Sequence, residues 1–264
     1  MKSFPLLLLL ALAVLPLLML SGSEAAPAGK SISGSPVVVE LFTSQGCSSC
    51  PPADRLLAKL EQNPRLAGKV IPLSFHVDYW NYIGWTDPFS SPRWSERQKA
   101  YGRAFRSNRI YTPQLVVNGA SECVGSNEGE VMRRIDKALA TDPAARVTLA
   151  VQPGAGDQLQ AKVGVQLAPA LPAKGNLDLW VAVYETGLST PVGAGENASR
   201  TLKNDYVVRR LEKAFTLPAE AGARHSDEIA LGIDKRWKRQ NLGVVAFVQD
   251  AATLAIYGAA AQKL

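Results

Sequence analysis

The sequence predicts two folds in series: an α/β domain over residues 36–143 and an all-β, sandwich-like domain over residues 144–264. In the first segment, short β-branched runs alternate with helical stripes of apolar residues, as in parallel strands joined by crossover helices. An Asn118-Gly119 pair between two apolar runs adds a β-hairpin. After residue 143 the helical stripes stop and strand-like runs follow, separated by Gly, Pro and Asp.

The composition allows a sizeable core and gives no sign of a nucleic-acid-binding surface. The chain has 264 residues, of which 47% are hydrophobic, and a formal net charge of +6. The basic residues are spread along the sequence without interleaved stacking aromatics, so we expect no nucleic-acid partner. We also expect no cofactor.

The first 26 residues are predicted to be a secretory signal peptide. Lys2 supplies the positive charge, residues 4–20 are almost entirely apolar, and Ser23-Glu24-Ala25 provides small residues for cleavage. The alternative is an uncleaved membrane anchor, although about 17 apolar residues is short for a spanning helix. Residues 27–35 are polar and predicted to be a flexible leader. We therefore expect a periplasmic or secreted protein, with no stable membrane insertion after cleavage, in a compartment where disulfides persist.

The expected order of elements in residues 36–143 is strand, helix, strand, helix, hairpin, helix. The expected strands cover residues 37–42, 70–77, 114–117 and 120–124, and the expected helices begin at Pro51, at Ser95 with Gln98 completing a capping box, and after Asn127. A β-α-β unit followed by a β-β-α unit is the plan of a thioredoxin-like domain. We therefore predict an α/β thioredoxin-like N-terminal domain.

The Cys47-Ser48-Ser49-Cys50 motif is the strongest candidate for chemistry. A helix start places two cysteines three residues apart on one face, and the helix dipole there stabilises a thiolate. Cys47, at or just before the helix, is the expected nucleophile, and Cys50, one turn in, is the expected resolving thiol. Two alternatives remain: an inert structural disulfide, and half of a zinc site. Zinc needs four ligands, and only Cys123, His76 and His225 could complete the set, so no metal is predicted.

Two further elements are expected beside the cysteines. Pro113, which opens the hairpin strand, is predicted to be cis and to pack against the motif, while Thr112 offers backbone groups to an extended substrate. Glu40 is the only charged residue in the first strand, where burial would raise its pKa and let it pass a proton to Cys50. Alternatively, Glu40 faces solvent or pairs with an arginine.

The end of the second strand predicts one wall of a substrate cleft, formed by His76, Asp78, Tyr79 and Trp80. The alternative is a hydrogen-bonded histidine and a packed aromatic loop. Cys123 is expected to face Gln114 across a two-residue hairpin turn, as a buried, inert thiol or as a third thiol reachable on rearrangement.

Several motifs resemble those of the bacterial family known as domain of unknown function 1223. The matching stretches are Val39-Glu40-Leu41-Phe42-Thr43-Ser44-Gln45-Gly46-Cys47-Ser48-Ser49-Cys50-Pro51-Pro52-Ala53-Asp54, His76-Val77-Asp78-Tyr79-Trp80, Gly84-Trp85-Thr86-Asp87-Pro88-Phe89, Tyr111-Thr112-Pro113-Gln114, Gly195-Glu196-Asn197 and Val207-Val208-Arg209. The resemblance implies a thioredoxin-like domain followed by a β-rich one, and no known substrate.

Together these observations predict an exported bacterial thiol–disulfide oxidoreductase that acts on protein thiols or disulfides through Cys47 and Cys50. The alternative is an extracytoplasmic binding or interaction module in which the two cysteines form a permanent disulfide. The sequence leaves the direction of the reaction, the partner and the oligomeric state open.

Overall fold

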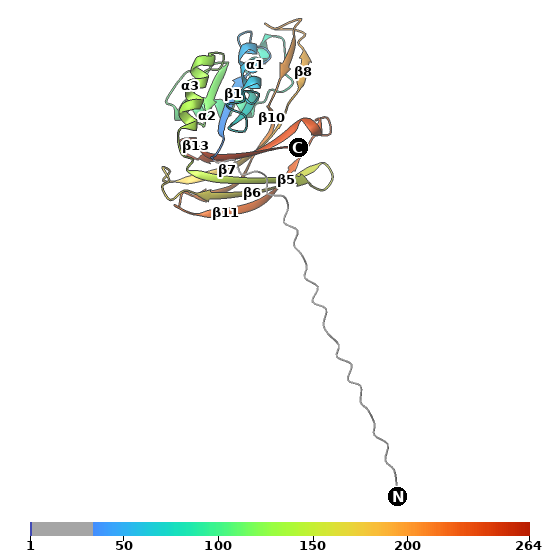
Figure 1. The fold of residues 1–264 in the computed structure, drawn as a ribbon. Coiled ribbons are helices and arrows are strands. Elements are labelled where there is room, and N and C mark those ends of the chain that lie inside the picture. The colour runs from blue at the N-terminus through green and yellow to red at the C-terminus, as the bar shows by residue number, and fades with distance from the viewer. Residues whose placement is uncertain (2–33) are drawn as a thin grey trace. The chain divides into compact units, whose positions relative to one another are not determined.

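The largest β-sheet of this protein draws its strands from both halves of the chain (Figure 1). The computed structural model describes Met1 and residues 34–264. The expected signal peptide and most of the expected leader lie outside the described residues.

Strands dominate the described residues. The helices are α1 (Pro51–Leu60), α2 (Pro92–Ala104) and α3 (Glu128–Leu139), with 3₁₀ turns at Asn81–Ile83 and Arg239–Asn241. The strands are β1 (Val37–Thr43), β2 (Val70–His76), β3 (Gln114–Val117), β4 (Ser121–Val124), β5 (Ala145–Pro153), β6 (Gln158–Leu167), β7 (Asn176–Glu185), β8 (Leu188–Pro191), β9 (Thr201–Asn204), β10 (Val207–Pro218), β11 (Arg224–Gly232), β12 (Leu242–Asp250) and β13 (Ile256–Lys263).

An eight-stranded mixed sheet organises the fold, with the order β13-β12-β7-β10-β2-β1-β3-β4. β1 and β2 are parallel, and β3 and β4 continue the sheet as an antiparallel hairpin. On the other side β10 lies parallel to β2, where Val207 pairs with Ser74 and the Ser74 N–H donates to the Tyr206 carbonyl at 2.8 Å. A three-stranded sheet, β11-β6-β5, and the two-stranded β8-β9 complete the strands.

The predicted fold class, an α/β thioredoxin-like N-terminal domain plus an all-β sandwich-like C-terminal domain, is wrong. The protein is mostly β, and β1 to β4 form one end of a mixed sheet whose other strands come from residues 176–263. The individual strands and helices of residues 37–139 were largely expected, but the sheet to which they belong was not.

The error has a physical cause in β10, the strand that joins the two halves. Its sequence, VVRRLEKAFTLP, carries four charged residues, and the sequence analysis did not identify it as a strand. Only its first residues are continuously buried, and these are the ones that reach β2. Apolar periodicity predicts that a strand exists but not which strand it pairs with.

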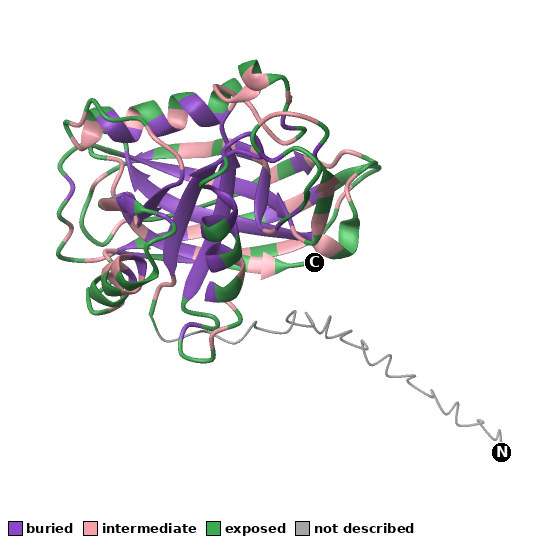
Figure 2. Cartoon of the chain, turned by 90° about the horizontal axis from the view of Figure 1, so that it is seen from above, coloured by how far each residue is buried: buried purple, intermediate pink, exposed green. Residues whose placement is uncertain are grey.

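Three apolar clusters cover the large sheet. One face of β1 packs on α1 and α3, while its opposite face packs on α2 and on residues of β2, β10 and β12. Towards the other end of the sheet, one face of β7 and β12 packs on β5 and β6. Figure 2 shows the resulting pattern, with the central strands buried and the helices exposed on one side. Burial on both faces explains why β1, β2 and β12 are nearly continuous apolar runs.

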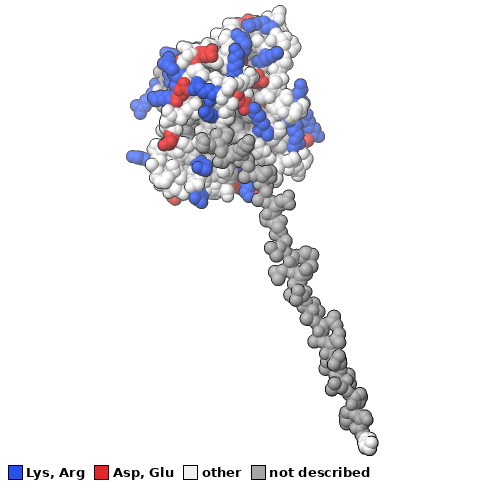
Figure 3. Space-filling view, viewed as in Figure 1, with Lys and Arg blue, Asp and Glu red and all other residues white. Residues whose placement is uncertain are grey.

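The surface carries both signs of charge. On the face shown in Figure 3, acidic side chains lie among the basic ones. In the part of the chain that the structure describes, no helix is both long enough and apolar enough to cross a membrane.

Local details depart from the expected boundaries in two places. α2 begins at Pro92 after an N-cap at Ser91, not at Ser95, because Pro suits the first helical position. The hairpin turn contains Ala120 as well as Asn118-Gly119, so Cys123 faces Leu115 instead of Gln114. The cap at Asn127 is confirmed, since its side chain accepts from the Glu130 N–H.

A buried ion pair in the first half of the chain is hydrogen-bonded to a side chain from the second half. The Arg97 Nε donates to the Glu40 carboxylate at 2.6 Å, and the Tyr101 hydroxyl donates to the other carboxylate oxygen. Gln249 of β12 donates to the same hydroxyl at 3.0 Å. Burial lowers the pKa of Arg97, but the adjacent Glu40 carboxylate raises it by more, so the net shift is upward. The guanidinium therefore stays charged between the sheet and α2. Removing either charge leaves the other buried without a counter-charge.

We expect Arg97→Met to lower the free energy of unfolding by about 3–5 kcal/mol, because it leaves the Glu40 carboxylate buried without a counter-charge. The double variant Glu40→Met/Arg97→Met is expected to recover at least half of that loss. Denaturant unfolding followed by circular dichroism measures both. Arg103→Met, on the exposed side of the same helix, is the matched control and should change stability by less than about 0.5 kcal/mol. Equal losses of stability in the single and double variants would contradict the claim that the unpaired Glu40 carboxylate causes the loss.

Candidate functional site

The candidate site is a disulfide between Cys47 and Cys50, in the loop that leads from β1 into α1. Cys50 is the N-cap of α1, and its carbonyl accepts from the N–H groups of Ala53 and Asp54 at 2.9 and 3.1 Å. Cys47 therefore lies one turn before the helix, earlier than expected. Ser48 and Ser49 between them are exposed, whereas Cys47 and Cys50 are only 1% and 0% exposed.

The start of α1 offers its dipole to the cysteines but few free donors. Pro51 and Pro52 occupy the first two helical positions and carry no N–H. The next two N–H groups are bound to Cys50. The Ser49 hydroxyl lies within hydrogen-bonding distance of the Cys47 sulfur, at 3.3 Å. A thiolate at Cys47 would therefore depend on the dipole and on this hydroxyl.

A segment from the second half of the chain holds the cysteine loop. The Asn197 Nδ2 donates to the carbonyls of Gln45 and Cys47, each at 2.9 Å, and Asn197 is 0% exposed. The neighbouring Glu196 accepts from the Ser48 N–H at 2.8 Å. Three backbone groups of the loop are thus bound by two residues about 150 positions away in sequence.

A buried carboxyl lies one helical turn beyond Cys50. Asp54 is four residues further along α1, so the two side chains share a face of the helix, and Asp54 accepts from the Thr43 hydroxyl at 2.9 Å. Burial raises the pKa of Asp54 to about 6, against the opposing effects of His76 and the Thr43 hydrogen bond. Asp54 can therefore change its protonation state near neutral pH.

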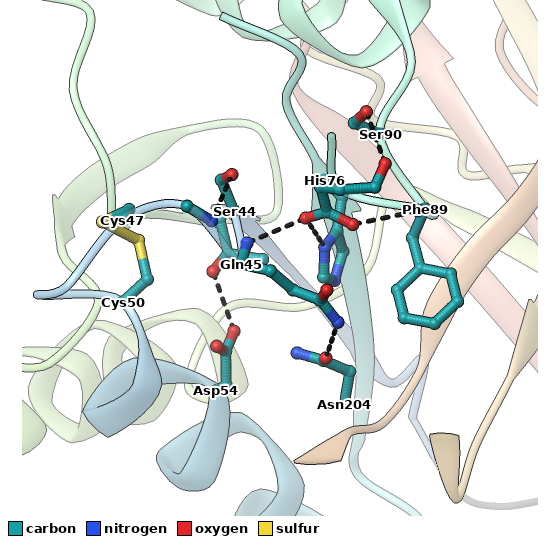
Figure 4. A network of polar contacts seen from close by, with 12 residues as sticks. Ser44, Gln45, Cys47, Cys50, Asp54, His76, Phe89, Ser90 and Asn204 are labelled. Carbon is teal, nitrogen blue, oxygen red and sulfur yellow. Dashed lines mark hydrogen bonds and ion pairs between the residues drawn. A yellow bond between two sulfur atoms is a disulfide. The ribbon is translucent and has the colours of Figure 1, made fainter. Parts of the chain in front are cut away.

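His76 and Asp87 form a second buried group beside the cysteine loop. His76 Nδ1 lies 2.7 Å from Asp87 Oδ2, and the same oxygen accepts from the Gln45 N–H at 2.8 Å. Figure 4 shows Gln45 between the disulfide and His76. Burial favours neutral forms of both partners, but their mutual attraction outweighs it, so the pKa of His76 is raised and that of Asp87 is lowered. Their attraction therefore favours the charged forms of both side chains.

The structure places Glu40 away from the disulfide. Its side chain lies on the α2 face of β1, whereas α1, which follows Cys50, packs on the opposite face. Of the two expectations for Glu40, the pairing with an arginine is the one that the geometry supports. Asp54 occupies the position near Cys50 that was expected for Glu40.

Trp80 connects the cysteine loop to the predicted proline segment. Its indole N–H donates to the Thr112 hydroxyl at 2.8 Å, and its Cβ lies against Gly46, where an added Cβ would come within 3.2 Å. The Thr112-Pro113 peptide is cis. The geometry brings Trp80 and Thr112 towards the site, while their role in binding a substrate stays a prediction.

The other residues of the predicted cleft wall are anchored on α2. The Asp78 carboxylate accepts from the Ser95 hydroxyl, and the Tyr79 hydroxyl donates to Gln98 at 3.1 Å. Burial raises the pKa of Tyr79 to about 12. Both residues therefore hold the aromatic loop on the helix. Their hydrogen bonds are to α2 and not to the cysteine loop.

Cys123 is the free cysteine of the described residues, and it lies in the cluster between β1, α1 and α3. Burial raises the pKa of its thiol to about 11. Such a thiol is almost entirely protonated at neutral pH and a poor nucleophile.

Sequence reasoning missed Asp54, Asp87, Glu196 and Asn197. Asp54 carried a signal, since a carboxyl four residues after a helix-starting cysteine must share its face. Asp87 and Asn197 reach the site through tertiary contacts that no local pattern encodes. Within residues 34–264, no group of three or more His, Cys, Asp or Glu side chains is placed to hold a metal ion.

Solved structures resemble this fold over most of its length. Protein AGR_C_4864 from Agrobacterium tumefaciens is 30% identical, with a TM-score of 0.66, covering 88% of this chain and 96% of that one. HBP35 of Porphyromonas gingivalis is 18% identical, with a TM-score of 0.67, covering 88% of this chain and 76% of that one, and is similar in fold alone. No curated protein matches the chain significantly.

The family model for proteins of unknown function described as DUF1223 matches residues 38–249. This range contains the disulfide, the buried Asp54 and the segment that holds the cysteine loop. The resemblance found in the sequence motifs is confirmed, and the chain belongs to the DUF1223 family.

Proposed function

We propose that this protein is a thiol–disulfide oxidoreductase that exchanges its Cys47–Cys50 disulfide with the thiols or disulfides of protein partners. One observation carries the proposal: the disulfide stands at the N-terminal end of α1, with a buried carboxyl of raised pKa one turn beyond Cys50. The sulfur pair accepts two electrons as the disulfide, or donates two as the dithiol, and the carboxyl can move a proton to or from the buried sulfur.

Stability alone is a weak reason for this disulfide. In the chain-entropy account, closing a loop of only four residues stabilises a protein by about 2 kcal/mol, against about 3 kcal/mol for fifteen residues. The loop is also already held by hydrogen bonds from Asn197 and Glu196. A bridge that adds little to an already anchored loop fits a role in chemistry.

The unfavourable burial of the Asp54 carboxylate also supports a role in chemistry. A shift from the usual 3.8 to about 6 means that burial of the ionised form is unfavourable, by roughly 3 kcal/mol at about 1.36 kcal/mol per unit. An asparagine could keep the hydrogen bond from Thr43 without that cost. A group that lowers stability in this way is typical of the trade-off between stability and activity at functional sites.

The proposed reaction begins when a thiolate attacks the Cys47 sulfur. The Cys47–Cys50 bond breaks, a mixed disulfide forms at Cys47, and Cys50 leaves as a thiolate that takes a proton from Asp54. A second thiol displaces Cys47, so two thiols are oxidised to a disulfide while the protein's disulfide is reduced by two electrons. In the reverse direction Asp54 accepts the proton of Cys50, which then resolves the mixed disulfide. The reaction needs no separate cofactor.

The expected signal peptide supports protein partners in the periplasm or outside the cell, where disulfides form and persist. Thr112, Pro113 and Trp80 are proposed to line the partner's approach, because Trp80 joins this segment to the cysteine loop.

A second candidate is an extracytoplasmic binding or interaction module in which the disulfide is structural. The burial of both cysteines favours it, since an exchange reaction requires access to a sulfur. The two candidates differ in the reduction potential of the disulfide.

We expect a reduction potential above about −300 mV, because structural disulfides of secreted proteins fall below that value. Equilibration of the folded protein with dithiothreitol buffers of known ratio, followed by alkylation and mass measurement, gives the potential. A value far below this threshold supports the structural bridge instead.

Cys50→Ala is expected to trap mixed disulfides through Cys47 in the exporting cell, because the resolving thiol is gone. Non-reducing electrophoresis and mass spectrometry identify the adducts. Cys47→Ala is the matched control and should trap far fewer, since Cys50 is buried at the N-cap of α1 whereas Cys47 adjoins the exposed Ser48. Both variants should also carry Cys123→Ala. Absence of adducts from Cys50→Ala counts against the enzyme.

Asp54→Asn is expected to raise the free energy of unfolding by about 2–3 kcal/mol at pH 8 and by almost nothing at pH 3. The sign follows from the raised pKa: below the unfolded value of 3.8 Asp54 is protonated in both states, and its destabilising effect grows as pH rises from there through the folded value of about 6. The same variant should slow disulfide exchange at least several-fold at pH 7, which a purely structural role would not do. Asp142→Asn, at an exposed site, is the control for both measurements.

A further inference from the structure

The Glu196 carboxylate is fixed against the backbone of Ser48, the residue that follows the sulfur-bearing Cys47. Glu196 lies between β8 and β9, and its Oε2 accepts from the N–H of Ser48, the residue after Cys47, at 2.8 Å. Asn197 anchors the segment from within the protein, through the carbonyls of Gln45 and Cys47. Gly195, at φ +75°, permits the close approach to Ile83, since an added Cβ would come within 3.0 Å of that side chain.

The charge of Glu196 is not neutralised by a counter-ion. Hydrogen bonds from Ser48 lower the pKa of this exposed carboxyl, so it is ionised at neutral pH. Arg200, the cation nearest in sequence, donates to Asn197 Oδ1 at 2.7 Å. Among residues 34–264, Glu196 takes part in no ion pair.

The attacking species in disulfide exchange is an anion, the thiolate. Both cysteines are buried, and the exposed residues between them are Ser48 and Ser49, so the thiolate reaches Cys47 past these two serines. This is also the side where Glu196 binds Ser48. Its negative charge therefore repels the approaching thiolate, unless the partner carries a positive charge close to its sulfur.

We propose that Glu196 selects the partners of the Cys47–Cys50 disulfide, favouring thiols flanked by lysine or arginine and rejecting acidic thiols. This inference rests on the proposed function and adds the charge class of the substrate. The chemistry is the exchange already described, in which the partner thiolate forms a mixed disulfide with Cys47 and Cys50 leaves. Glu196 acts on the encounter as a specificity-determining residue.

Three small thiols that differ in charge test the proposal directly: cysteamine, which is cationic, 2-mercaptoethanol, which is neutral, and 3-mercaptopropionate, which is anionic. The rate constant for opening the disulfide of the folded, full-length chain is measured by alkylation and mass at low ionic strength. Intrinsic differences among the thiols cancel when the ratio of cysteamine to 3-mercaptopropionate rates is compared between proteins.

Glu196→Gln is the decisive variant, since a glutamine oxygen can still accept from Ser48 while the charge is lost. Two charges about 4 Å apart in water change a rate roughly fivefold, and the two thiols differ by two charges. We therefore expect the rate ratio to fall at least fivefold in Glu196→Gln, and to fall in the native protein as salt is raised. Glu220→Gln, which removes an exposed carboxylate elsewhere, should leave the ratio unchanged.

The outcomes separate the two proposals. If the disulfide of the folded protein reacts with all three thiols and Glu196→Gln leaves the ratio unchanged, charge selection by Glu196 is overturned while the exchange chemistry stands. If none of the thiols opens the disulfide of either folded protein, the oxidoreductase fails and charge selection fails with it. A rise in all three rates by the same factor also overturns selection, because it shows only that the segment covers the sulfur.

Discussion

The parallel contact between β2 and β10 is the constraint on which the rest of the structure depends. It is short, with Val207 opposite Ser74 and one hydrogen bond from Ser74 to Tyr206. It nevertheless joins two groups of strands into one eight-stranded sheet. β9 and the segment before it lead directly into β10, so the same contact fixes where Glu196 and Asn197 meet the cysteine loop. The second half of the chain thereby becomes part of the site.

Charges buried on the two faces of this sheet serve different purposes. On the α2 face, Glu40 and Arg97 neutralise each other, and neighbouring hydroxyl and amide groups satisfy their remaining hydrogen bonds. On the side of the disulfide, His76 and Asp87 are similarly paired, but Asp54 has a single neutral hydrogen-bond donor, the Thr43 hydroxyl. A nearby opposite charge favours the ionised form of a group, whereas burial without one favours the neutral form. This difference is why the proposed proton transfer is assigned to Asp54, whose pKa is raised to about 6, rather than to Glu40.

How far the sequence predicts this arrangement depends on the range of each interaction. The strand before Cys47, the helix after Cys50 and the Asn127 cap follow from local patterns, and all are present. The predicted hairpin register was wrong by one residue because Ala120 is part of the turn, and this shift places Cys123 opposite Leu115 instead of Gln114. The prediction of which strands share a sheet was wrong because β10 is rich in charged residues and its pairing is decided by tertiary packing. Asn197 lies 150 residues from Cys47, and no periodicity or spacing connects residues that far apart.

The burial of the disulfide and its proposed chemistry are compatible if the covering segment opens locally. What closes the site towards Ser48 is a small set of hydrogen bonds, one to the charged Glu196 and two from Asn197. The two hydrogen bonds from Asn197 contribute about 1 kcal/mol net each, and the bond to the exposed Glu196 is weakened by solvent screening. These contacts are few compared with those that hold the large sheet, so the segment can release the loop while the core stays folded. A segment that covers the disulfide in this way lowers the rate of thiol–disulfide exchange with every thiol but does not prevent it. A partner that binds Glu196 through its own cation would remove one of these contacts as it arrives, and the same carboxylate would then both shield the sulfur and admit the thiol that matches it.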